Sequence, residues 1–124
     1  MRVKGKGPHN ATLMFVGEGP GWEEDRAGEP FVGKTGQELD RFLDGEVLPS
    51  RDEVFLTNLY RQYHGKDYIY TSEDLAQDEP ELIAELQQVK PRLIVPLGRH
   101  ATRWFLGDVD LDGVQGIPWL SPND

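Results

Sequence analysis

The amino-acid sequence predicts an α/β fold, with three layers in the order α/β/α and a short, mainly parallel central sheet. Three short apolar runs have the length of strands, and a glycine or an asparagine ends each of them, over residues 12–16, 53–58 and 92–97. Helical patterns follow these runs, over residues 37–48, 72–89 and 99–106. This alternation of strand and helix favours a parallel sheet with helices on both faces.

The first strand, TLMFV, leads directly into a glycine-rich stretch that begins at Gly17. The helix predicted over residues 37–48 has four apolar side chains on one stripe, and Pro49 ends it: Leu39, Phe42, Leu43 and Val47. The second strand, EVFLTN, is followed by a polar and aromatic stretch over residues 59–70 that predicts a loop.

The next helical pattern contains a proline, so we expect a break at Pro80. Asp78 and Glu81 then suit a capping box for the second part of this helix. Its buried face is predicted to consist of Leu82, Ile83, Leu86 and Val89. Residues 117–120 predict a last strand at the edge of the sheet, because a proline at position 118 is tolerated only there.

Length and composition indicate one domain over residues 1–124, without a membrane span, in a reducing cytoplasm. The chain has 124 residues and no cysteine, which excludes disulfides and thiolate metal sites. No apolar run reaches the roughly 18 residues that a membrane helix needs. We expect a monomer without a cofactor or a metal.

The charge balance is acidic, which restricts how the chain can bind nucleic acid. There are 22 acidic and 13 basic residues, for a formal net charge of -9. Binding to nucleic acid then requires a local basic groove. The bases bunch at three places, near Arg2, between Arg61 and Lys66, and between Arg99 and Arg103. Scattered surface charge is the alternative interpretation.

The glycine-rich stretch over residues 17–36 should lie where a parallel sheet binds ligands, beyond the carboxyl ends of its strands. Gly17, Gly19 and Gly21 allow another molecule to approach the backbone closely, and Pro20 stiffens the turn. Glu18 is thus held where a carboxylate can face a ligand. A phosphate cradle is disfavoured, because the stretch is acidic and matches no phosphate-binding motif. A plain tight turn is the other alternative.

Three stretches resemble the uracil-DNA glycosylase superfamily, most closely its family-four branch. GEGPGWEEDRAGEPFVGKTGQELD (residues 17–40) is similar to the family's GEAPGxxEDxxGxPFVGxAGxLLD. FLTNLYR (residues 55–61) is similar to its strand ending in TN, and VKPRLIVPLGRHATRWFLG (residues 89–107) to its IRPRxIVxLGxxAxxxLLG. The resemblance covers roughly residues 13–120.

The resemblance implies a role for three side chains. Glu18 activates or positions water and steadies the cationic sugar, which suits a fixed carboxylate. Phe31 stacks on the flipped base and forms a wall of the pocket outside the core, and Asn58 reads the edge of uracil with its amide. Phe31 as a core residue and Asn58 as a turn residue at the strand end remain alternatives. The substrate site is expected to be completed by Gly17, Gly19, Pro20, Gly21 and Gly98.

Two departures from the family pattern bear on activity. The iron–sulfur members use four cysteines, and two of these positions are Gln62 and Asp78 here, so the cluster cannot form. We expect tyrosines to pack in its place: Tyr60, Tyr63, Tyr68 and Tyr70. The family's later HPxx motif is matched only by GIPWLSPND, in which Asp124 falls near the histidine position. The three histidines, His9, His64 and His100, lie outside that motif.

The resemblance therefore implies an enzyme that hydrolyses the N-glycosidic bond of uracil in DNA, for base excision repair. We expect weak activity, from a domain that either lacks its final segment or works without it. A non-catalytic module that binds uracil-containing DNA or a protein partner is the alternative from another class. A nucleoside hydrolase acting on free deoxyuridine is a third interpretation.

Overall fold

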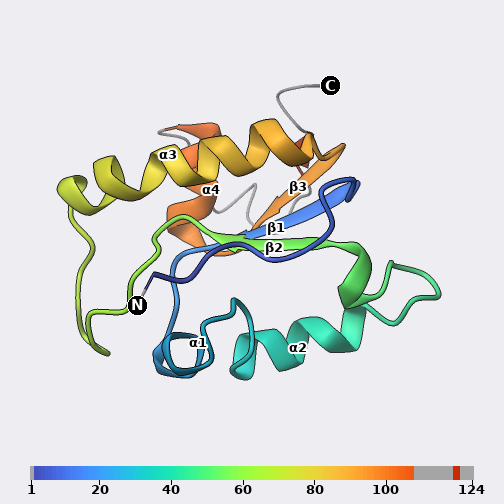
Figure 1. Ribbon diagram of the computed structural model, residues 1–124, viewed down its shortest axis with the longest axis horizontal. Helices are drawn as coiled ribbons and strands as arrows, with labels where there is room; N and C mark the ends of the chain where they lie inside the picture. The colour runs from blue at the N-terminus through green and yellow to red at the C-terminus, as the bar shows by residue number, and fades with distance from the viewer. Residues whose placement is uncertain (1, 108–118, 121–124) are drawn as a thin grey trace.

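A computed structural model describes residues 2–107 and 119–120 and shows a central sheet between two layers of helices (Figure 1). The strands are β1 (Leu13–Gly17), β2 (Phe55–Asn58), β3 (Leu93–Pro96) and β4 (Trp119–Leu120), in the spatial order β2-β1-β3-β4. β1 pairs in parallel with β2 and with β3, and β4 pairs antiparallel with β3. The α/β class and the mainly parallel sheet are confirmed.

The helices lie on both faces of this sheet, as the strand and helix order predicts. One face carries α1 (Trp22–Ala27) and α2 (Lys34–Phe42), and the other carries α3 (Ser72–Val89) and α4 (Arg99–Leu106) (Figure 1). A short 3-10 turn, Arg51–Glu53, precedes β2.

The alternation of side chains along β1 separates two core clusters. Met14 and Val16 pack into a cluster with residues of α3 such as Leu82 and Leu86. Phe15, one position away, packs into the other cluster, which also contains Leu39 of α2. Because side chains on a strand alternate between faces, one five-residue strand anchors both helical layers.

The helix predicted over residues 37–48 begins and ends earlier than expected. It runs from Lys34 to Phe42, and the N–H of Leu43 closes its last turn on the carbonyl of Leu39. Gly45 then adopts a left-handed conformation with a φ of 82°, which turns the chain before Pro49. The apolar stripe is correspondingly shorter, because Phe42 and Val47 are exposed.

The break expected at Pro80 is wrong, and α3 is continuous. Its cap is Thr71, whose hydroxyl accepts from the N–H of Asp74, so Asp78 does not cap a second part. Pro80 and Ala76 are both exposed, so water can satisfy the carbonyl of Ala76 that the proline leaves without an N–H partner.

Two further predictions need adjustment. Ile83 is exposed, whereas Leu82, Leu86 and Val89 form the buried face of α3 as expected. The last strand lies at the sheet edge, over Trp119–Leu120, and positions 117 and 118 of that prediction lie outside the described residues. No helix among the described residues is long and apolar enough to cross a membrane.

Candidate functional site

The parallel pairing of β1 and β2 brings two of the sequence motifs together. Gly17 at the end of β1 lies opposite Asn58 at the end of β2. The two segments stay paired beyond the sheet, since the N–H of Tyr60 donates to the carbonyl of Glu18 at 2.8 Å. The Leu97 N–H donates to the Val16 carbonyl at 2.8 Å. The segment that leads to Gly98 therefore starts at the same edge.

Gly17 is the point at which the predicted side chains meet. A Cβ at this position would lie 2.6 Å from Asn58 Oδ1 and 2.9 Å from Phe31 Cζ. Both side chains therefore rest against the same piece of backbone, which only glycine leaves open. The structure thus brings Phe31, Asn58 and the Glu18 backbone into one place.

Asn58 is buried, at 5% exposed, yet its side-chain amide is not used within the described part of the chain. An amide that offers a donor and an acceptor without an internal partner is available to a ligand.

Phe31 is 6% exposed and belongs to a core cluster, so the expectation that it lies outside the core is wrong. Its backbone has a φ of 55°, which is unusual for an aromatic residue. Arg51 Nη2 holds this turn by donating to the carbonyls of Phe31, at 2.5 Å, and Pro30, at 3.0 Å. The ring occupies the core and also borders Gly17.

The acidic character of the glycine-rich loop has a structural cause that the sequence analysis missed. One carboxylate oxygen of Glu24 accepts from the backbone N–H groups of Val32, at 3.0 Å, and Gly33, at 2.7 Å. Its other oxygen accepts from the N–H of Gly21 at 2.9 Å. Glu24 therefore ties the two ends of the loop together, which fixes the position of Phe31 between them.

Glu18 has an unexpected neighbour, His100, in the first turn of α4. Nε2 of His100 lies 3.0 Å from Oε2 of Glu18, and both side chains are about half exposed. Gly98, immediately before α4, has a φ of 87° and open space where a Cβ would lie. Of this segment the sequence analysis gave Gly98 as a site residue, and it assigned no role to His100, two residues later.

A cleft of about 520 Å³ opens beside Glu18. The glycine-rich loop forms one side of it, and aromatic side chains form much of the rest: Trp22, Tyr63, Tyr68 and Tyr70. Tyr70 stacks on Tyr60 with 3.9 Å between ring centroids and meets the Tyr68 ring edge-on at 5.5 Å. Burial, helped by the negative charge of Glu18, raises the pKa of Tyr70 well above its ordinary value.

The positions that correspond to the family's cluster cysteines do not fit an iron–sulfur cluster. The Gln62 carbonyl accepts from the Tyr70 hydroxyl at 2.9 Å. Asp78 accepts from Arg2 Nη2 at 2.8 Å and from the Arg61 N–H at 2.9 Å. Hydrogen bonds and an ion pair thus hold this region. Three of the four tyrosines expected here, Tyr60, Tyr68 and Tyr70, also pack against one another.

Two of the basic residues that the sequence analysis assigned to the basic bunches are engaged in this network. Arg61 is fully buried, and its guanidinium donates to both oxygens of Glu85 at 2.8 Å. Arg2 pairs with Asp78 and Glu81.

Among the described residues, no group of three or more histidine, aspartate and glutamate side chains is placed to hold a metal ion.

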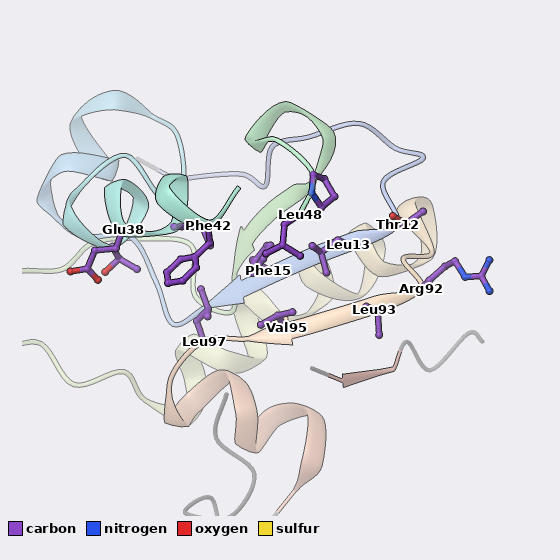
Figure 2. A pocket seen from close by; sticks show the side chains of 13 residues that line it. Thr12, Leu13, Phe15, Glu38, Phe42, Leu48, Arg92, Leu93, Val95 and Leu97 are labelled. Carbon is purple, nitrogen blue, oxygen red and sulfur yellow. The ribbon is translucent and has the colours of Figure 1, made fainter. Parts of the chain in front are cut away.

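A larger hollow among the described residues lies elsewhere, between α2 and the strands β1 and β3 (Figure 2). It has a volume of about 950 Å³, and its polar lining consists of Thr12, Thr35, Glu38 and Arg92. Figure 2 shows Glu38 and Arg92 at opposite ends of the groove, with mostly apolar side chains between them. Because no convergent polar groups face this groove, we place the candidate site at Gly17, Glu18 and Asn58, at the carboxyl edge of the sheet.

The structure is thus an α/β protein of three layers in which the buried Asn58 amide and the Phe31 ring lie against Gly17, next to Glu18, at the carboxyl edge of the sheet. The family model described as "Uracil DNA glycosylase superfamily" matches residues 4–123. The chain belongs to the uracil DNA glycosylase superfamily.

Similar proteins agree with this membership. The chain is 33% identical over 109 residues to the Type-4 uracil-DNA glycosylase of Saccharolobus solfataricus, covering 88% of this chain and 50% of that protein. It is 35% identical over 103 residues to that of Sulfurisphaera tokodaii, covering 83% and 47%. It is 36% identical over 110 residues to that of Archaeoglobus fulgidus, covering 89% and 55%. The chain thus spans about half the length of these curated relatives.

Proposed function

We propose that this chain releases uracil from DNA by hydrolysing the N-glycosidic bond. The observation that carries the proposal is the meeting of Phe31 and Asn58 at Gly17, directly before the carboxylate of Glu18. The names of the similar proteins, Type-4 uracil-DNA glycosylases, support the same activity.

The chemistry requires that the bond between uracil N1 and C1′ of the sugar breaks, with its electron pair leaving on the uracil. Positive charge then develops on the sugar, and the Glu18 carboxylate stabilises it. Water adds to C1′ and gives its proton to Glu18, and the uracil anion takes up a proton from solvent. The carboxylate oxygen is in reach of water, because the side chain is about half exposed.

Selection of uracil falls to Asn58 and Phe31. Uracil presents O4 and N3–H side by side, and an amide can donate to the first and accept from the second. Cytosine presents an amine and an unprotonated N3 at these places, so the same amide orientation repels it. Phe31 is held by Arg51 and Glu24 at the border of this position and supplies the aromatic contact for a flipped base.

We propose slow release by the 124-residue polypeptide. The family's histidine motif has no counterpart among the 124 residues, and the position near Asp124 lies outside the described residues. One missing stabiliser of the leaving anion costs about a hundred- to a thousand-fold in rate. Fusing a family-like segment that carries the histidine should therefore raise the single-turnover rate, and an unchanged rate would show that another residue does this work.

The DNA backbone contacts are proposed to come from a short basic groove rather than from all the bases. Arg2, Lys6 and Arg61 are engaged with carboxylates. Lys66 lines the cleft and Arg99 is exposed next to His100. About two phosphate contacts predict a weak dependence of binding on salt. The proposal places a monomer in a reducing cytoplasm, in line with the absence of cysteine.

The second candidate function is a non-catalytic module that binds uracil-containing DNA or a protein partner. The observation that favours a protein partner is the apolar groove, at the end of which Phe42 is 66% exposed. Turnover separates the two functions. Uracil release that is lost in Glu18→Ala and kept in Glu29→Ala, a charge-matched change in the same stretch, supports the enzyme, and no release from the wild-type chain supports the module.

A further inference from the structure

The cleft beside Glu18 has two exposed aromatic walls that the uracil site described above does not use. Trp22, the first residue of α1, is 55% exposed, and Tyr68, in the loop before α3, is 40% exposed. Both line the cleft, together with the less exposed rings of Tyr63 and Tyr70. Large aromatic surfaces left in water at a concave site indicate a planar ligand.

Both walls are fixed by neighbouring side chains. The guanidinium of Arg26 lies over the Trp22 ring, 4.6 Å from its centroid. The Tyr68 hydroxyl donates to Asp74 Oδ2 at 2.6 Å, and the Tyr68 ring lies 4.3 Å from that of His64. Rings that are already held in place lose little conformational entropy when a ligand stacks on them.

The polar groups of the cleft suit a nucleobase better than a phosphate alone. Glu18 and Glu23 line it with carboxylates, which repel phosphate but accept hydrogen bonds from base N–H and amino groups. Lys66 is the single lysine or arginine in the lining of the cleft, so a phosphate bound here would contact one positively charged side chain. Flat apolar walls with acceptors and a single cation match one nucleotide of a strand.

We propose that this aromatic cleft, walled by Trp22 and Tyr68, binds the base of the nucleotide next to the uracil. The inference rests on the proposed function, because Glu18 belongs both to the proposed uracil site and to the lining of the cleft, and this makes the two adjacent. A neighbouring base in a duplex is paired and stacked on both sides, whereas in a single strand it is free to enter the cleft. The cleft therefore selects uracil in single-stranded DNA.

The experiment measures equilibrium binding without turnover, using oligonucleotides that carry 2′-fluoro-deoxyuridine, whose sugar resists cation formation. In one single strand the two nucleotides flanking the uracil have bases. In the other both flanking positions are abasic, so the phosphates remain and only the bases are lost. We expect the wild-type chain to bind the first about 5- to 150-fold more tightly, the worth of one base stack.

Variants then assign the preference to the cleft. Trp22→Ala and Tyr68→Ala should bind both strands with nearly equal affinity, whereas Tyr68→Phe, which keeps the ring, should retain the preference. Phe42→Ala removes an exposed ring outside the cleft and should also retain it. Equal binding of both strands by the wild type, an equal loss on both strands in Trp22→Ala, or tighter binding of the matching duplex would overturn the proposal.

The two proposals fail separately. A chain that releases no uracil yet shows the flanking-base preference loses the glycosylase function and keeps the aromatic cleft. A chain that releases uracil and binds both strands equally keeps the function and loses the cleft.

Discussion

Replacing Gly17 by alanine tests whether the contact of Phe31 and Asn58 with this backbone is the base-reading site. The added Cβ would lie 2.6 Å from Asn58 Oδ1 and 2.9 Å from Phe31 Cζ, whereas ordinary contact begins at 3.4 Å. To restore ordinary contact, the Asn58 amide must move by roughly 0.8 Å. A misplacement of about 1 Å in an active site costs on the order of a hundred-fold in rate. We expect single-turnover uracil release from a single-stranded oligonucleotide to fall by about 10- to 100-fold.

The same change also overpacks the core, at a cost of about 1–3 kcal/mol in the free energy of unfolding. Urea unfolding measures this cost, so the rate can be expressed per folded molecule. Gly5→Ala is the matched control, because its Cβ would lie 2.5 Å from Glu85 Oε2 and 2.6 Å from a ring carbon of Phe55, neither of them in the candidate site. Its rate per folded molecule should not change. A full rate in folded Gly17→Ala would refute the assignment of the site.

Three other changes test the neighbouring interactions. His100→Ala should lower the release rate about tenfold by freeing the Glu18 carboxylate, and His100→Gln, which keeps an N–H donor, should retain most of it; equal losses would remove His100 from the mechanism. Asp78→Ala removes the buried carboxylate that accepts from Arg2 Nη2 and from the Arg61 backbone N–H, and leaves that N–H without its acceptor, so it should lower the free energy of unfolding in urea by about 1–3 kcal/mol; no measurable loss would contradict this. The raised pKa of Tyr70 means that the unfolded chain loses this proton near pH 10 while the folded chain keeps it, so stability should fall as pH rises above about 10. Tyr70→Phe should make that fall shallower, and an unchanged slope would show that Tyr70 ionises normally.

The order of the strands and of the three helices between and after them could be predicted from the sequence, because the apolar runs are short and are ended by glycine or asparagine, but the six-residue helix α1 was missed because it lies in the acidic, glycine-rich stretch. The extent of the second helix could not be predicted. Phe42 and Val47 continue the apolar period of Leu39 and Leu43, but Gly45 turns the chain away before Pro49. Periodicity alone cannot show where a glycine takes a left-handed conformation.

The unbroken course of α3 through Pro80 could not be predicted either. A proline in a helix removes one hydrogen bond whatever its surroundings, and the sequence does not show that Ala76 and Pro80 share an exposed side. The role of Asp78 was missed for a related reason, since Arg2 is far away in the chain and only the fold brings them together.

The candidate site could be located from the sequence because parallel strands place Gly17 and Asn58 at one edge. The contacts that position it are long-range and leave no local signal. Glu24 holds backbone groups eight and nine residues away, and His100 reaches Glu18 from another helix. Phe31 matched the family motif, but its burial depends on a turn at positive φ that a sequence pattern does not specify.

The most direct test of the glycosylase account is the release of free uracil from a single-stranded oligonucleotide by the purified 124-residue chain, followed in single turnover. The account predicts slow but measurable release of uracil, none of cytosine or thymine, and loss of at least a hundred-fold in Glu18→Ala with Glu29→Ala unchanged. No release from the wild-type chain, or release that persists in Glu18→Ala, would contradict it.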